Sequence, residues 1–183
     1  AINNMTIVAP ADNLEASEVI KQAVSYNKPL YIRYGKKPMM DIHPAGTKFK
    51  IGKSILVKKG EDLTIIATGE TLQRTYLAYE ILKENNIHCS IISMHTIKPF
   101  DKETFLEFST NSKAILTIEE HSMFGGLGES CANLIAQNNI DTKLKILGIP
   151  DEYMINGSQS DVLDYYNMSP EKIVEISKDL LNK

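Results

Sequence analysis

Apolar residues along this chain alternate between short continuous runs, which are typical of buried strands, and stripes with helical spacing. The runs predict strands at Thr6–Ala9, Leu30–Tyr34, Lys53–Val57, Leu63–Thr68, Ile87–Ser93, Ala114–Ile118 and Leu144–Ile149. The stripes predict helices at Leu14–Ser25, Leu72–Glu84, Lys102–Thr110, Glu129–Gln137 and from Pro170 to about Leu181. Strands that alternate with helices favour an α/β fold with a mainly parallel sheet.

Local signals place the ends of several helices. Asp12 precedes the first helix and Glu15 follows three residues later, which is the spacing of a capping box. Asp101 is the expected N-cap of a later helix, and Ser169 followed by Pro170 starts the last one. Residues 35 to 52 hold glycines, prolines and lysines without periodicity, so they are the best candidate for a linker.

Composition narrows the class of protein. The chain has 183 residues, 43% of them hydrophobic and 23% charged, which fits one globular domain or one domain plus a fragment of another. A net charge of −3 without a basic patch argues against nucleic acid as a partner. No apolar run approaches the ~20 residues of a membrane span, and no signal peptide is expected. Two cysteines fit buried free thiols in a reducing, cytoplasmic location.

The beginning of the chain suggests a longer parent protein. Ala1 leads almost directly into the first predicted strand. We therefore expect the chain to be a piece of a larger polypeptide.

A polar corner follows the strand that ends at Ile118. Glu119, Glu120 and His121 come first, and the glycine turn 125–128 then leads into a helix. Ligands and partners often meet open α/β sheets at the edge where such corners lie. A coupled carboxylate and imidazole could transfer protons. We favour a structural corner whose side chains cap the next helix or meet a neighbouring domain.

Two other chemistries receive little support. A helix N-terminus after glycines can bind phosphate, but the spacing is not Gly-x-Gly-x-x-Gly, so we favour tight packing of the helix on its strand. The four histidines are far apart in the sequence, and no His-x-x-His or Cys-x-x-Cys spacing occurs, so we expect no metal site. The histidines are His43, His88, His95 and His121.

Five sequence blocks together resemble the carboxyl-terminal part of the transketolase family. They are Val8-Ala9-Pro10-Ala11-Asp12 with Glu15, Pro29-Leu30-Tyr31-Ile32-Arg33, Leu63-Thr64-Ile65-Ile66-Ala67-Thr68-Gly69, Met94-His95-Thr96-Ile97-Lys98-Pro99-Phe100-Asp101, and Glu119-Glu120-His121 with Gly125-Gly126-Leu127-Gly128. The blocks occur in the family's order and span nearly the whole chain. The residues of the last two blocks, with Thr-Ile-Lys-Pro and Glu-Glu-His, are most similar to those of split bacterial transketolase-like proteins. In those proteins the chain is divided into two subunits.

The resemblance implies a domain organisation. Residues 1–42 would be the carboxyl-terminal strand-helix-strand remnant of a pyrimidine-binding domain, and residues 43–52 a linker. Residues 53–183 would be a transketolase C-terminal domain, with a mainly parallel three-layer sheet of about five strands. Family members bind thiamine diphosphate and Mg²⁺ between two earlier domains and transfer a two-carbon ketol unit between sugar phosphates.

The resemblance also implies what this chain lacks. The family's catalytic glutamate, the aromatic residue that stacks on the coenzyme and the Gly-Asp-Gly motif all belong to earlier segments. We therefore predict no catalytic, cofactor-binding or metal-binding residue here, no bound coenzyme and no activity of the chain alone. Missing amino-terminal domains or a separate subunit, and a second copy in a homodimer, are the expected partners.

Arg33 is the candidate substrate-binding residue. It ends a predicted strand where the family places an arginine that reaches a sugar phosphate, and its planar fork suits phosphate or carboxylate. The alternative is a surface arginine that pairs with an acid. Lys36 and Lys37 could add positive potential nearby, although most lysine pairs in loops are only solvated.

Two other functions stay open at this stage. The chain could come from the beta subunit of a 2-oxoacid dehydrogenase and act as a module that docks a partner. It could also be a free-standing regulatory domain that binds a nucleotide, which would require a ligand on the glycine turn.

Overall fold

The chain folds around two β-sheets, and the computed structural model describes residues 2–182. The strands are β1 (Thr6–Val8), β2 (Leu30–Ile32), β3 (Ile55–Lys58), β4 (Leu63–Ala67), β5 (Cys89–Ser93), β6 (Thr96–Lys98), β7 (Ala114–Ser122) and β8 (Lys143–Ile149). The helices are α1 (Asn13–Ala23), α2 (Thr71–Glu84), α3 (Lys102–Asn111), α4 (Leu127–Gln137), α5 (Gln159–Tyr165) and α6 (Pro170–Asn182).

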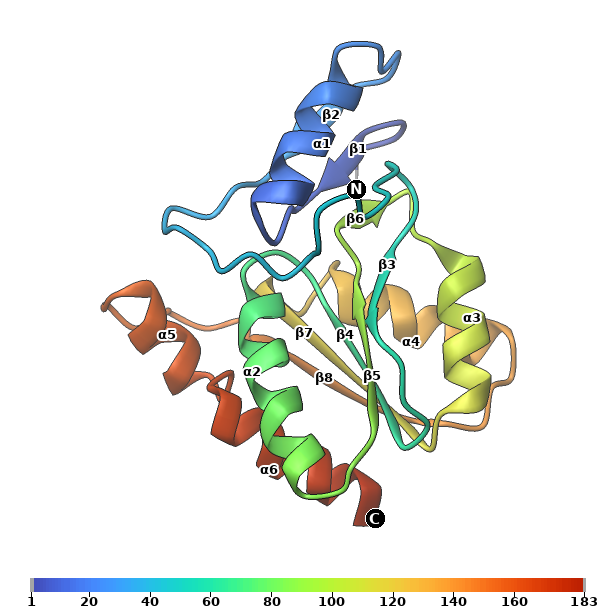
Figure 1. Ribbon diagram of the computed structural model, residues 1–183, viewed down its shortest axis with the longest axis vertical. Helices are drawn as coiled ribbons and strands as arrows, with labels where there is room; N and C mark the ends of the chain where they lie inside the picture. The colour runs from blue at the N-terminus through green and yellow to red at the C-terminus, as the bar shows by residue number, and fades with distance from the viewer. Residues whose placement is uncertain (1, 183) are drawn as a thin grey trace.

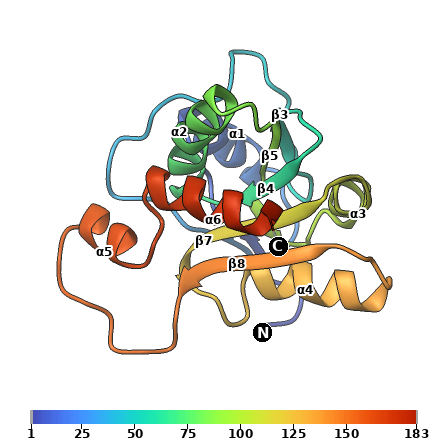
Figure 2. The ribbon, with the colours of Figure 1, turned by 90° about the horizontal axis from the view of Figure 1, so that it is seen from below.

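The larger sheet has five strands in the order β3-β5-β4-β7-β8. Strands β5, β4, β7 and β8 are parallel, and β3 runs antiparallel along the edge next to β5. Helices α2 and α6 cover one face, whereas α3 and α4 lie on the other (Figures 1 and 2). The predicted mainly parallel three-layer sheet of about five strands is therefore confirmed.

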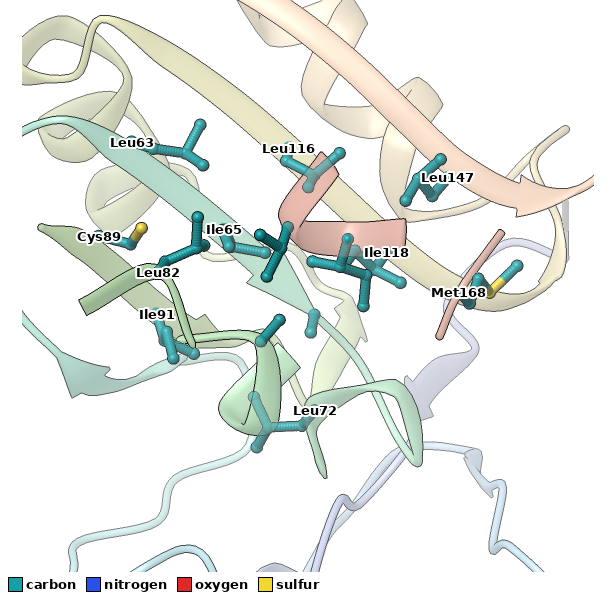
Figure 3. Packing of buried hydrophobic residues seen from close by; sticks show 14 of the residues in the cluster. Leu63, Ile65, Leu72, Leu82, Cys89, Ile91, Leu116, Ile118, Leu147 and Met168 are labelled. Atoms are coloured by element: carbon teal, nitrogen blue, oxygen red, sulfur yellow. The ribbon is translucent and has the colours of Figure 1, made fainter. Parts of the chain in front are cut away.

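The core lies on both faces of this sheet because its central strands are apolar on both sides. Successive side chains alternate between faces, so Ile65 packs in the cluster beneath α2 and α6 while Ile66 packs in the cluster beneath α3 and α4. Figure 3 shows the first cluster, which combines Leu72 of α2 and Met168 before α6 with strand residues such as Ile65 and Ile118. Burying one such side chain contributes about 1.5–3 kcal/mol.

The smaller sheet joins the amino-terminal residues to the rest of the chain. Strand β1 pairs in parallel with β2 around α1, which is the predicted strand-helix-strand unit. On its other side β1 pairs antiparallel with β6, a segment that the sequence indicated only as a connection. Three residues are too few for a periodicity, and β6 becomes a strand only because β1 lies beside it.

Two further differences from the predicted elements concern the carboxyl-terminal half. Strand β7 continues to Ser122, so the polar corner lies inside the strand rather than after it. Helix α5 was not predicted, although Ser158 and Asp161 form a reciprocal capping box at its start. Within residues 2–182, no helix is both long and apolar enough to cross a membrane.

Candidate functional site

The candidate site is a cavity at the carboxyl edge of the large sheet, where the two sheets meet. Arg33 follows β2, Glu70 stands at the N-cap of α2, and Glu120 lies near the end of β7. The cavity has a volume of about 510 Å³. Its lining also includes Tyr34, Gly35, Lys36, Ile149, Met154 and Gln159.

Arg33 and Glu120 form an ion pair inside this cavity. The backbone N–H of Arg33 donates to the carbonyl of Val8 at 2.9 Å, so the arginine is anchored to the small sheet. Its side chain is 35% exposed, whereas that of Glu120 is 4% exposed. Burial raises the pKa of Glu120 to about 7 and the charge of Glu70 adds to this effect, although Arg33 opposes both.

Two glycines make room for the two buried acids. A Cβ atom on Gly35 would lie 1.6 Å from Glu70 Oε1, and one on Gly69 would lie 2.7 Å from Glu120 Oε1. Gly69 also has φ +56°, which glycine adopts without strain. A side chain at either position would therefore force the neighbouring carboxylate of the cavity to move.

Each acid has one oxygen without a hydrogen-bond donor. Glu70 Oε1 and Glu120 Oε2 are buried and form no hydrogen bond within residues 2–182, although the backbone N–H of Glu70 lies near the Glu120 carboxyl group and opposes the rise of its pKa. Buried acceptors are normally satisfied, because burying one unpaired polar group costs about 1–3 kcal/mol. The cavity therefore presents unused acceptors next to a cationic guanidinium.

The neighbouring Glu119 has a structural role. Its carboxylate accepts hydrogen bonds from the backbone N–H groups of Leu127 at 2.7 Å and Gly128 at 2.8 Å, and so caps α4. Burial raises the pKa of Glu119 to about 7, although these two bonds oppose the shift. A Cβ on Gly128 would lie 2.4 Å from Ile146 Cγ2, which confirms the tight packing of this turn.

This capping carboxylate also occupies the position that a phosphate would need at the start of α4. His121 Nε2 lies 3.3 Å from Glu119 Oε2, and burial lowers the pKa of this histidine. The favoured structural interpretation of the corner therefore holds for Glu119. Glu120 instead faces the cavity and pairs with Arg33.

A second buried polar cluster connects the two sheets. His43 Nδ1 lies 2.7 Å from Asp12 Oδ2, and His43 Nε2 lies 3.4 Å from Glu15 Oε1. Ser93 Oγ, at the end of β5, donates to Glu15 Oε1 at 2.6 Å. Burial raises the pKa of Glu15 to about 7. Burial also favours neutral His43, but the hydrogen bond to Asp12 and the charge of Glu15 raise its pKa above the ordinary value.

The expected capping box at α1 is only half formed. Asp12 accepts from the backbone N–H of Glu15 at 3.0 Å, which confirms its N-cap role. Glu15 does not reach back to Asp12 but accepts from the N–H of Ala11 at 2.7 Å. Glu15 points into the interior because Ser93 and His43 hold its other oxygen.

The histidines and cysteines are not arranged for metal chemistry. Within the described part of the chain, no group of three or more His, Cys, Asp or Glu side chains is placed to hold a metal ion. His95 is buried beside Phe49 with 4.1 Å between ring centroids, and burial lowers its pKa to about 3. Cys89 and Cys131 are buried free thiols, as predicted.

Sequence reasoning located part of the cavity. It singled out Arg33 and Glu120, which lie far apart in the chain, and the structure brings them together. Lys36 lines the same cavity, whereas Lys37 lines the next one along α2. Glu70 was missed, and the Gly69-Glu70 pair at a strand-to-helix corner was the signal that could have found it. A substrate role of Arg33 stays a prediction.

Comparison with known proteins connects this geometry to one family. Residues 52–173 match the family "Transketolase, C-terminal domain". The chain is 38% identical to a protein of Methanocaldococcus jannaschii named as a transketolase C-terminal section, over 96% of this chain and 55% of that protein. It is 33% identical to one of the subunits of the apulose-4-phosphate transketolase of Phocaeicola vulgatus, over 98% of this chain and 57% of that protein.

A solved structure shows the same arrangement of elements. A protein described as a split gene transketolase, inactive beta4 tetramer, has a TM-score of 0.92 and 26% identity to this chain. The match covers 100% of this chain and 59% of that one. The chain thus spans a little more than half the length of these relatives.

Proposed function

Because this chain belongs to the transketolase family and carries its C-terminal domain, we propose that it is the C-terminal section of a thiamine-diphosphate-dependent transketolase. The proposed enzyme transfers a two-carbon ketol unit between sugar phosphates, and this section is inactive by itself. Both of the relatives from Methanocaldococcus and Phocaeicola are named transketolases, which favours this function over the beta subunit of a 2-oxoacid dehydrogenase. The capped start of α4 argues against a nucleotide site.

The observation that carries the proposal is the placement of Arg33. Its guanidinium is partly exposed in a cavity at the edge where α/β sheets bind ligands. A planar guanidinium can make two charge-assisted hydrogen bonds to a phosphate, and Lys36 lines the same cavity. We assign Arg33 to the phosphate of the sugar substrate in the complete enzyme.

The coenzyme does not fit the residues of this cavity. The same region offers no cluster of metal-ligating side chains among the described residues. We propose that thiamine diphosphate and Mg²⁺ are held by residues outside this chain.

Residues outside the chain are therefore required as partners. The Phocaeicola relative is named as one subunit of its enzyme and the similar solved structure is a split-gene protein, which supports a separate subunit or additional amino-terminal domains. We further propose that the assembly pairs two copies of this section and acts in the cytoplasm.

Reconstitution tests the proposal. Calorimetry of this chain with thiamine diphosphate and Mg²⁺ should show no tight binding, and the chain alone should not transfer ketol units. A complete assembly with the missing partner should transfer a two-carbon unit from a ketose phosphate to an aldose phosphate. Arg33→Ala should then raise KM for the phosphorylated substrates.

Arg74→Ala is the matched control. Arg74 also pairs with an acid, Asp164, but it lies on a different cavity. Activity that survives Arg33→Ala unchanged would remove the substrate role of Arg33. Absence of transfer in the complete assembly would refute the proposed function.

A further inference from the structure

The second feature of the cavity is its pair of buried acids, which a phosphate site does not require. Glu120 pairs with Arg33, and Glu70 lies beside them at the start of α2. Glycines at 35 and 69 leave the space that both carboxylates fill. Acids that are placed this closely around an arginine compete with any anion for its guanidinium.

From this arrangement we infer that Glu120 is a positioning residue for Arg33, and that it releases the guanidinium to an anionic ligand group by taking up a proton. The inference rests on the proposed role of Arg33. A protonated Glu120 would end its competition with the anion and could donate a hydrogen bond to it.

The burial of both acids supports this exchange. The residues Glu70 and Glu120 are 6% and 7% exposed, and each has an oxygen that no donor in residues 2–182 satisfies. Burial of Glu120 favours its protonated form, because burial penalises charge. The pKa of Glu120 is accordingly raised to about 7, by burial first and by Glu70 second.

The other titratable side chains in or near the cavity are a tyrosine, a histidine and a lysine. Burial raises the pKa of Tyr34 above its ordinary value of 10.0, and burial lowers the pKa of His121 below 6.5. Lys36 is the other basic side chain in the lining, on the loop after β2. From β8 and the segment around α5, the lining residues are uncharged. Glu70 is the second carboxyl group of the lining, so its contribution is separated from that of Glu120 by mutation.

Sulfate is a suitable probe because it keeps its charge throughout the relevant pH range. Its dissociation constant from this chain would be measured by NMR titration between about pH 6 and pH 8.5. If binding requires protonated Glu120, the dissociation constant rises by up to about tenfold per pH unit above the Glu120 pKa. In Glu120→Gln we expect tight binding that no longer depends on pH, and in Glu70→Gln a pH dependence that remains.

Glu119→Gln provides the matched control. Glu119 is also buried and also has a pKa raised to about 7, but it caps α4 and forms no ion pair with Arg33. This variant should keep the wild-type pH dependence of sulfate binding. In the unmutated chain, the Arg33 Nε and Glu120 Cδ resonances should titrate together, which tests the inference even where a variant folds poorly.

Three results would overturn the inference. They are wild-type sulfate binding that is absent or constant with pH, a Glu120→Gln variant with unchanged pH dependence, and Arg33 and Glu120 resonances with separate midpoints. Assays of the reconstituted enzyme distinguish a failure of the inference about Glu120 from a failure of the proposed function. Transfer that still depends on Arg33 but not on Glu120 would leave the proposed function standing.

Discussion

Asp12 is expected to hold the amino-terminal unit against the rest of the molecule. Its carboxylate accepts from the backbone N–H groups of Glu15 at 3.0 Å, Ile42 at 3.0 Å and His43 at 2.9 Å. It also meets His43 Nδ1 at 2.7 Å. Asp12→Ala would remove all four contacts while leaving their donors in place.

The loss of unfolding free energy in Asp12→Ala can be worked out from these contacts. Loss of an N-cap costs about 1 kcal/mol, and each buried donor left unsatisfied costs about 1–3 kcal/mol. Breaking one partner of a buried ion pair costs about 3–5 kcal/mol. Since these contributions overlap, we expect Asp12→Ala to lower the free energy of unfolding by about 3–5 kcal/mol in total. Asp12→Asn keeps the shape and one acceptor, so its loss should be smaller.

The loss of unfolding free energy in Asp12→Ala should depend on pH in a defined direction. The pKa of His43 is raised above 6.5 because its bond to Asp12 and the charge of Glu15 outweigh its burial, so its contribution is complete below 6.5 and is lost as pH rises through the folded-state pKa. Burial favours protonated Asp12, but the bonds from His43 and Glu15 lower its pKa well below 3.8. Its contribution is therefore present above 3.8 and is lost only as pH falls through the lowered value. The difference between wild type and Asp12→Ala should be largest between these limits.

Urea unfolding followed by circular dichroism measures this difference. Asp161→Ala is the control, because Asp161 also accepts a backbone N–H at a helix start but is exposed. Its effect should be much smaller. If Asp12→Ala costs no more than Asp161→Ala at about pH 5.5, the reasoning about this cluster is wrong.

Three further outcomes test other parts of the structure. Gly35→Ala should lower stability by about 1–3 kcal/mol in urea unfolding, because its Cβ would overlap the Glu70 carboxylate; an unchanged midpoint would refute this. Glu119→Gln should become more stable relative to wild type as pH rises from 4.5 to 7, because a raised pKa costs stability once the folded carboxyl ionises; a constant difference in unfolding free energy would contradict the assignment. Cys89 and Cys131 should react with a thiol reagent only after unfolding, since both are buried and burial raises the pKa of Cys89 to about 12; rapid labelling of the native chain would disprove it.

The large sheet could be predicted because its signals are local. Strands β4 and β5 are buried at every residue, so their apolar runs identify them without knowledge of their neighbours. The pairing order and the antiparallel direction of β3 were not predicted, since they depend on contacts between distant segments. Helix α5 has a clear start signal, but seven residues are too short for a convincing stripe.

The site was less predictable because its partners are remote in sequence. Arg33 and Glu120 could each be selected from their place at a strand end, but nothing in the sequence pairs them. Glu70 resembles an ordinary acid at a helix start, and its fit against Gly35 becomes visible only in three dimensions. His43 falls in the expected linker, yet it is buried against Asp12.

Strand β6 connects the amino-terminal unit to the larger sheet, because it pairs with β1 and directly follows β5 in the chain. A shortened chain that starts at residue 53 would lack β1, so the backbone of β6 would be exposed. Such an open strand edge favours self-association. The same truncation would remove Glu15, which accepts the hydrogen bond from Ser93 Oγ. The first fifty residues thus cover an edge of the remainder, and we expect the two portions to be best expressed as one unit.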